Sequence, residues 1–305
     1  MTTSSASSSD KSPLIRIGDV TIERVDELVL PTSVRWMMPD ATREATAPCS
    51  EWLKPYFQNA DGFLLQSIHT FVVKTPSAVI LVDTGVGNGK ERAGGIPQFH
   101  HLDTPYLERL AALGVTPEAV DLVLCTHIHV DHCGWDAHLE GGRWTPTFPR
   151  ARHLFTRSEY EYWNSVAPEQ PATAQLLADS VRPVVEAGLA TFVAVDHVVS
   201  PEVRLVPMHG HTPGHVCIEI ESRGQRAVIT GDVMHSPIQC AFPDLPAALD
   251  RDKEAGAAGR RAFLARYADT GTIVLGSHFG SPSVGRVTKD GDAWRFDVAL
   301  DVIEG

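Results

Sequence analysis

Short apolar runs separated by polar or glycine-rich connections are spread along the whole chain, a pattern typical of buried strands joined by loops. We predict strands over residues 14–17, 20–25, 70–74, 78–82, 122–125, 191–195, 203–207, 215–220, 227–230 and 272–275. Apolar residues at helical spacing predict helices over residues 105–113, 158–165, 172–187 and 260–267. Because strands dominate both halves and helices fall between some of them, the pattern indicates an α/β protein of sheets flanked by helices.

Two segments do not fit this alternation. Residues 1–12 are rich in Ser and Thr, and we predict a disordered tail there, followed by a single domain over residues 13–305. Residues 30–62 carry aromatic and Met side chains with little periodicity. A long loop of this kind is either a packed cover or a lid over a site, and an oligomer contact in a homodimer is a further reading.

The acidic composition narrows the classes of partner. The 305 residues carry a formal net charge of -12, and 43% of them are hydrophobic, which is enough for a sizeable core. Nucleic-acid binding depends on clustered Lys and Arg, and docking on anionic membranes depends on basic surfaces. We therefore expect neither a nucleic acid nor a membrane as a partner.

The cysteines and the N-terminus bear on the compartment. The five cysteines are odd in number, scattered and never spaced as C-x-x-C, so neither a disulfide framework nor a thiolate zinc knuckle is expected. The N-terminal residues have no apolar core of a secretory signal, and no apolar run is long enough to span a bilayer. The expected location is the cytoplasm.

The strongest chemical signal is the segment Thr126-His127-Ile128-His129-Val130-Asp131-His132, which directly follows an apolar run. In an extended backbone, residues two apart point to the same side, so His127, His129 and Asp131 share a direction. Neutral imidazole and carboxylate are suitable ligands for zinc and similar divalent ions. A single His would more readily be a surface or core residue, but this cluster predicts a metal site.

A second group of histidines lies in Pro207-Met208-His209-Gly210-His211-Thr212-Pro213-Gly214-His215, between two predicted strands. Its glycines and prolines predict a tight turn that can direct a side chain. We expect one of its three histidines to bind metal, and the other two to lie behind the ligands or on the surface.

Two further predicted strands end in candidate ligands. Asp232 follows the run 227–230, and His278 follows the run 272–275. A carboxylate at the end of a buried strand is costly unless it meets a cation. Each signal is weak alone, but polar sites are commonly built where several strands of an α/β protein end.

Taken together, these motifs resemble those of the metallo-β-lactamase fold superfamily. The resemblance rests on H-x-H-x-D-H at residues 127–132, G-H-T-P-G-H at 210–215, G-D at 231–232, S-H at 277–278 and an early D-T-G turn at 83–85. It extends over residues 14 to 300 and implies a four-layer αβ/βα sandwich with two metal ions at one edge of the sheets.

The resemblance also implies roles for individual residues. His127, His129 and His215 would hold the first metal; Asp131, His132 and His278 would hold the second; Asp232 would bridge the two. Asp83 would support the site from behind the ligands. The ions would be zinc, with manganese, cobalt or iron as alternatives. Candidate catalytic residues are Asp131 and Asp232, as proton carriers, and His235, as a donor to a substrate oxygen.

The activity implied is hydrolysis of a lactone or carboxylic ester by a hydroxide that bridges the two metals and is activated by them. The alternative is a phosphotriester hydrolase using the same site. A β-lactamase, a thioesterase, a ribonuclease, a dioxygenase or a non-catalytic scaffold fits the residues less well. We expect a small substrate with an apolar or aromatic part. Candidate residues for an apolar pocket are Trp36, Met37, Trp52, Tyr56, Phe57 and Phe242.

Overall fold

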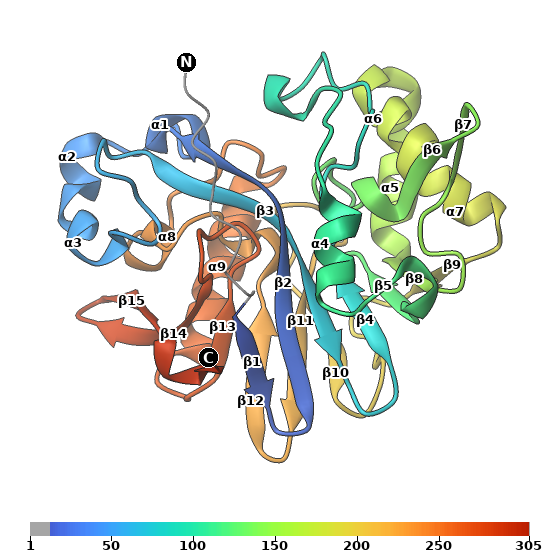
Figure 1. Cartoon of the computed structure of the whole chain (residues 1–305). Coiled ribbons are helices and arrows are strands. Elements are labelled where there is room, and N and C mark those ends of the chain that lie inside the picture. The colour runs from blue at the N-terminus through green and yellow to red at the C-terminus, as the bar shows by residue number, and fades with distance from the viewer. Residues whose placement is uncertain (1–12, 305) are drawn as a thin grey trace.

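The computed structural model describes residues 13–304, and the tail predicted over residues 1–12 lies outside them. Two sheets face each other in the centre of the molecule (Figure 1). The first sheet has eight strands in the spatial order β16-β1-β2-β3-β4-β5-β8-β9. These strands span, in that order, Ile303–Glu304, Leu14–Ile17, Val20–Thr32, Leu64–Lys74, Val79–Val82, Leu122–Leu124, Arg152–Thr156 and Ala190–Val193.

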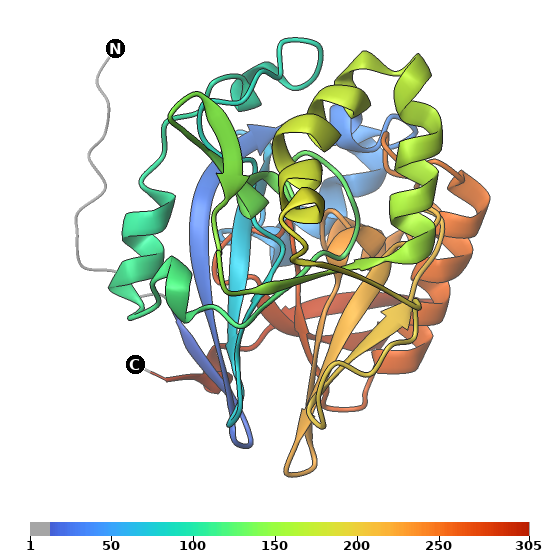
Figure 2. The same ribbon diagram turned by 90° about the vertical axis from the view of Figure 1, so that its right-hand side faces the viewer.

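The second sheet has six strands in sequential order. They are β10 (Val203–Pro207), β11 (Val216–Ser222), β12 (Gln225–Ile229), β13 (Ile273–Leu275), β14 (Val284–Asp290) and β15 (Ala293–Val298). A separate hairpin is formed by β6 (Ala137–Glu140) and β7 (Arg143–Pro146). In the turned view, the blue and cyan strands of the first sheet face the orange strands of the second (Figure 2).

Period-two alternation along the strands explains why each sheet is covered on both faces. In β4, Ile80 and Val82 point into the core between the sheets, whereas Leu81 points outward beneath a helix. In β12, Ala227 and Ile229 face the same inner core, and Val228 faces outward. Both faces are apolar, so each sheet must be covered on its outer side as well.

Helices supply the two outer layers. The outer face of the first sheet is covered by α4 (Tyr106–Ala112), and that of the second by α9 (Lys253–Tyr267). The remaining helices are α1 (Val34–Met37), α2 (Arg43–Thr46), α3 (Ser50–Leu53), α5 (Arg157–Val166), α6 (Pro171–Leu176), α7 (Arg182–Glu186) and α8 (Ile238–Ala241). The order helix, sheet, sheet, helix confirms the predicted αβ/βα sandwich.

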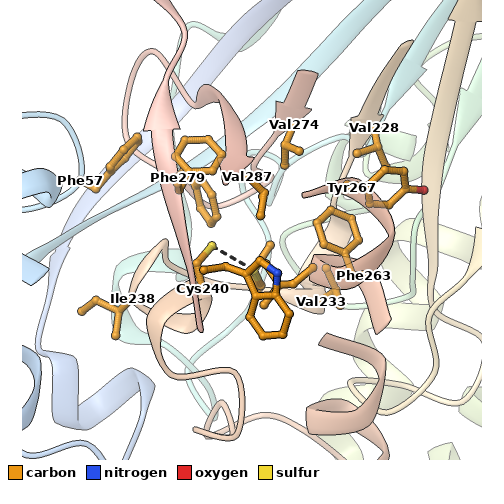
Figure 3. Close-up of a cluster of buried hydrophobic side chains, with 14 of the residues drawn as sticks. Phe57, Val228, Val233, Ile238, Cys240, Phe263, Tyr267, Val274, Phe279 and Val287 are labelled. Atoms are coloured by element: carbon orange, nitrogen blue, oxygen red, sulfur yellow. Dashed lines mark hydrogen bonds between the residues drawn. The ribbon is translucent and has the colours of Figure 1, made fainter. Parts of the chain in front are cut away.

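The segment 30–62 is largely a packed cover. Its Met37, Met38, Leu53 and Phe57 are buried in the cluster on the outer face of the second sheet. Figure 3 shows Phe57 in this cluster beside Phe279, and their ring centroids are 5.8 Å apart. These side chains fill a core, so Met37 and Phe57 do not line an open pocket as we had predicted. Trp36 is the exception, with 47% of its surface exposed, and an oligomer contact there stays a prediction.

Several predicted elements have different limits in the structure. The predicted helix 172–187 is interrupted by a π-helical turn at Leu177–Val181, and α9 begins earlier than the predicted helix 260–267. The hairpin β6–β7, strands β8, β14, β15 and β16, and the short helices α1, α2, α3 and α8 were not predicted. Among residues 13–304, no helix is both long and apolar enough to cross a membrane.

Candidate metal centre

The predicted ligands meet where strands of both sheets end. Strand β4 runs parallel to β5, and β12 runs parallel to β13, so the segments that follow these strands emerge at the same edge. The loop after β5 carries residues 127–132, the turn after β12 carries Asp232, and the turn after β13 carries His278. The β10–β11 connection adds His211. Four separate parts of the chain therefore converge.

One group of ligand atoms comes from His127, His129, His211 and Asp232, and all of them lie within 4.8 Å of one another. Nδ1 of His129 is 2.9 Å from Nε2 of His127 and 3.1 Å from Nε2 of His211. Oδ2 of Asp232 is 3.6 Å from Nε2 of His127 and 3.3 Å from that of His211. These atoms surround a volume suited to one ion.

A second group comes from Asp131, His132 and His278, again within 4.8 Å of one another. The Nε2 atoms of His132 and His278 are 3.2 Å apart. Oδ1 of Asp232 lies 3.4 Å from the first of these nitrogens and 3.1 Å from the second. Asp232 therefore contacts both groups with different oxygens, which is the geometry of a bridging carboxylate.

Neighbouring groups set which nitrogen of each ring carries the proton. Nδ1 of His132 donates to Asp83 at 2.9 Å, and Nδ1 of His278 donates to the main-chain oxygen of Ser67 at 3.1 Å. Each Nε2 is then left with a lone pair, and the two lone pairs face each other. Two such lone pairs at 3.2 Å repel unless a cation or a proton lies between them.

In the first group, the rings of His127 and His211 are likewise oriented by hydrogen bonds from their Nδ1 atoms. The hydroxyl of Thr126 donates to Asp83 at 2.9 Å and therefore accepts from Nδ1 of His127, 3.1 Å away. Nδ1 of His211 donates to Asp250 at 3.0 Å. Both Nε2 lone pairs consequently point at the cluster. Carboxylates or other acceptors behind metal-binding imidazoles are a common feature of metal sites, because they fix the tautomer and the ring orientation.

The structure differs from the sequence-based expectation at His215. Its Nδ1 donates to the main-chain oxygen of Met208 at 2.9 Å, and its Nε2 accepts the main-chain N–H of Asp232 at 2.7 Å. Both nitrogens of His215 are engaged by the main chain, and the histidine of this connection whose Nε2 lies within the first group is His211. Burial, together with the nearby His211, lowers the pKa of His215 to about 3, so its ring is neutral.

His235 lies against the cluster as well. Its Nε2 is 3.1 Å from Oδ2 of Asp232, and its ring stacks on that of His278 with centroids 5.5 Å apart. The main chain of His235 is held by Gln239 and Gln66. Within residues 13–304 neither ring nitrogen of His235 has a hydrogen-bond partner that meets ordinary geometry, and the residue is only 2% exposed.

Burial and neighbouring charges shift the pKa values of histidines in opposite directions in the two groups. Burial lowers the pKa of His127 and of His129 well below the ordinary value, and neighbouring imidazoles add to this effect. At His132, burial acts in the same direction, but Asp232, Asp83 and Asp131 outweigh it and raise the pKa. His127 and His129 are therefore neutral imidazoles, while His132 sits in a negative field that favours a cation.

The candidate ligands differ in their exposure to solvent. His127, His211 and Asp232 are at most 2% exposed, whereas His129 and Asp131 are only half-buried. The residues behind the ligands were only partly predicted: Asp83 was expected from the D-T-G turn, and Asp250 was missed. Asp250 lies 39 residues after His211 in a polar stretch with no pattern, so no local signal could have identified it.

The family is shown by comparison with known proteins. A sequence model described as the metallo-beta-lactamase superfamily matches residues 65–278, which is most of the described chain and includes all the residues of both groups. The protein therefore belongs to the metallo-β-lactamase superfamily.

Solved structures share the whole fold with this chain. One is described as hydrolase AbOPH in the beta lactamase superfamily, with 23% identity, a TM-score of 0.78, and coverage of 95% of this chain and 99% of that one. Another is AidC, described as a dizinc quorum-quenching lactonase in complex with a product, with 21% identity, a TM-score of 0.75, and coverage of 94% and 97%. A third, a probable metal-dependent hydrolase from Staphylococcus aureus, has 20% identity, a TM-score of 0.72, and coverage of 94% and 99%.

Proposed function

We propose that this protein is a dinuclear metallohydrolase that cleaves lactones or carboxylic esters. The observation that carries the proposal is the convergence of imidazole lone pairs on the two oxygens of the buried Asp232. Such an arrangement is electrostatically unfavourable without cations and is well matched to a pair of them. The imidazole and carboxylate donors favour zinc, with manganese, cobalt and iron as alternatives.

We assign the ligands from the geometry. His127, His129 and His211 would hold the first ion, and Asp131, His132 and His278 the second, with Asp232 shared. This assignment replaces His215 by His211. When bound, the metal pair would supply a water of lowered pKa and Lewis acidity at the substrate oxygen.

Asp131 and His235 would carry the remaining chemistry. Asp131 is half-buried, so its carboxylate can exchange a proton with solvent, whereas Asp232 is buried among the ligands. Proton transfer to the leaving oxygen therefore falls to Asp131 in preference to Asp232. His235, which faces Asp232 and has no other partner for its ring in the described chain, would donate to the substrate oxygen.

An apolar surface beside the ligands supports a substrate with an apolar part. Val130 lies between His129 and Asp131, and it packs against the same buried cluster as the half-buried Leu28, Leu30 and Ile96. An aliphatic or aromatic substituent lying there would be next to the two half-buried ligands. AidC, a quorum-quenching lactonase, shares this fold, which supports a lactone as the first substrate to test.

The test combines metal analysis with a substrate panel. Protein stripped with a chelator and reloaded with zinc should hold close to two ions per chain and should regain activity only with metal. The panel would include aliphatic lactones of increasing chain length, aryl esters, an aryl phosphotriester and a β-lactam. A higher kcat/KM for the phosphotriester would favour the alternative activity. Two bound ions with no metal-dependent turnover of any lactone or ester would contradict the proposal.

A further inference from the structure

A single buried carboxylate joins the two loops that carry the first group of ligands. Glu159 lies in the first turn of α5 and is only 1% exposed. Its Oε1 accepts the main-chain N–H of Ile128 at 3.0 Å, and its Oε2 accepts the main-chain N–H of Gly214 at 2.8 Å. Ile128 lies between His127 and His129, and Gly214 lies three residues after His211. One side chain therefore holds both loops.

Neighbouring residues make this connection rigid. Trp163, one turn further along α5, donates its indole N–H to Oε1 of Glu159 at 2.6 Å, and its ring lies edge-on to that of His129 with centroids 5.2 Å apart. The hydroxyl of Thr156, just before α5, donates to the main-chain oxygen of Gly214 at 2.8 Å. The start of α5 thus contacts the β10–β11 loop through both the N–H and the C=O of one residue.

The close approach depends on Gly214. A Cβ atom at this position would lie 2.5 Å from the main-chain nitrogen of Glu159 and 2.6 Å from the hydroxyl oxygen of Thr156. Real side chains do not approach main-chain atoms so closely, so only glycine permits the contact. Gly214 belongs to the tight turn predicted from the sequence, and it has a second role, which is to let the β10–β11 loop contact α5 closely.

A buried carboxylate is costly, and this one is stabilised by its surroundings. It receives three hydrogen bonds from N–H donors, and such charge-assisted bonds are stronger than neutral ones. It also lies in the first turn of a helix, where the helix dipole favours negative charge. Glu159 does not belong to either group of ligand atoms, so its charge acts on the main chain around the ligands.

We propose that Glu159 is a positioning residue for the first metal site, holding His127 and His129 at a set distance from His211 before any ion binds. This inference rests on the proposed metal binding, and it goes beyond it by assigning a role to a residue that contacts neither metal nor substrate. It implies that the affinities of the two sites respond differently to a change at position 159.

The central variant is Glu159→Gln, which keeps the size of the side chain. Its amide presents an N–H group where a carboxylate oxygen now accepts, so at least one of the three donors loses its acceptor. Loss of a group that orients ligands typically costs about 10–100-fold in metal affinity. We expect a loss of this size at the first site and a much smaller change at the second, measured by zinc titration in competition with a chromogenic chelator.

Two further variants make the result interpretable. Glu161→Gln makes the same chemical change two residues along α5 at a side chain that is 65% exposed, and it should bind both ions as the wild type does. Trp163→Phe removes the indole donor while keeping an aromatic ring beside His129, and it should give a smaller loss of affinity at the first site. It also serves as the test variant if Glu159→Gln does not fold, because two of the three hydrogen bonds remain.

The outcomes separate this proposal from the proposed function. If the wild type binds no ions, the metal-site assignment itself fails. If the wild type binds two ions and folded Glu159→Gln binds both with unchanged affinity, or loses both equally, the positioning role is refuted. Excess zinc should restore kcat to Glu159→Gln under our proposal, because the ligands themselves are intact.

Discussion

The Nε2 atom of His215 accepts a hydrogen bond from the main-chain N–H of Asp232 at 2.7 Å, and this bond distinguishes His215 from His211. An imidazole nitrogen has one lone pair, so this atom cannot also bind an ion. The same ring donates from Nδ1 to Met208, which fixes its orientation. His215 therefore holds the segment that carries Asp232, while Nε2 of His211 lies among the atoms of the first group.

The exchange of roles between two histidines gives the first prediction. His211→Ala should reduce zinc content from about two ions to about one per chain, because it removes a ligand of the first ion only. His215→Gln should keep both ions, since an amide can donate to Met208 and accept from Asp232, at some cost in thermal stability. Metal analysis after dialysis measures the number of zinc ions per chain in both variants. Loss of an ion in His215→Gln and not in His211→Ala would restore the assignment made from sequence.

The contrast between these two histidines also shows what the sequence can and cannot predict. The motif at 127–132 and the strand-ending Asp232 and His278 were found because they are local patterns at the ends of apolar runs. The choice between His211 and His215 depends on partners elsewhere in the fold, in particular Asp250. Such long-range contacts leave no periodic signal, so the sequence leaves them open.

The same limit applies to the fold. Strands that contain a clear apolar run were predicted close to their observed limits, as for β10 and β12. The segment 30–62 left two readings open because its apolar residues lack a period, and only its contacts with Phe279 and the second sheet identify it as a core cover. Helix α9 was predicted too short because Gly256 and Gly259 weaken its helical pattern, although tertiary packing overrides them.

Asp83 supports the second site through His132, which gives the second prediction. Its carboxylate accepts from the main-chain N–H and the hydroxyl of Thr126 and from Nδ1 of His132. In Asp83→Asn the amide places an N–H group against one of these donors and weakens the orientation of His132. We expect affinity for the second ion to fall by about 10–100-fold.

A matched control for this change lies at the other end of the same pair of strands. Asp121 accepts the main-chain N–H of Val79 at 2.8 Å at an exposed position before β5. Asp121→Asn should leave zinc affinity unchanged. Equal zinc titration curves for Asp83→Asn and Asp121→Asn would show that Asp83 has no part in the site.

The third prediction concerns Gly231, which precedes Asp232. Its φ is +52°, and a Cβ atom would lie 2.5 Å from Nε2 of His215. Gly231→Ala should therefore incur the left-handed backbone penalty of about 1–2 kcal/mol and, in addition, about 1–3 kcal/mol of steric strain. Gly291 has a φ of +58°, and a Cβ atom added there would meet no atom within 4 Å. Gly291→Ala should therefore lose only the stability that corresponds to the left-handed backbone penalty. Urea denaturation measures the free energy of unfolding of both variants. Equal losses of stability in Gly231→Ala and Gly291→Ala would contradict a close approach at Gly231.

The last prediction concerns Lys90, a fully buried lysine in the loop that leads from β4 to α4. Its ammonium group contacts the main-chain oxygen of Asp179 at 2.5 Å and the hydroxyl of Ser180 at 3.1 Å, and it lies 4.1 Å from the centre of the Trp144 ring. Arg92 binds the same Asp179 carboxylate with two hydrogen bonds, so the carboxylate keeps a cationic partner even when Lys90 is neutral.

Burial lowers the pKa of Lys90 from 10.5 to about 8, and the attraction to Asp179 only partly opposes this shift. Between these two pH values the unfolded chain holds a proton that the folded protein has released, so the free energy of unfolding rises as pH increases through this window. The lowered pKa corresponds to a gain in the free energy of unfolding of the order of 3 kcal/mol across the full window.

Lys90→Met should remove this contribution, because methionine has a similar length and no charge. Urea denaturation of both proteins at intervals from pH 7.5 upward measures the difference, which isolates Lys90 from other groups that titrate in the same range. A stability difference between the two proteins that stays constant with pH would show that Lys90 does not change its proton occupancy on folding.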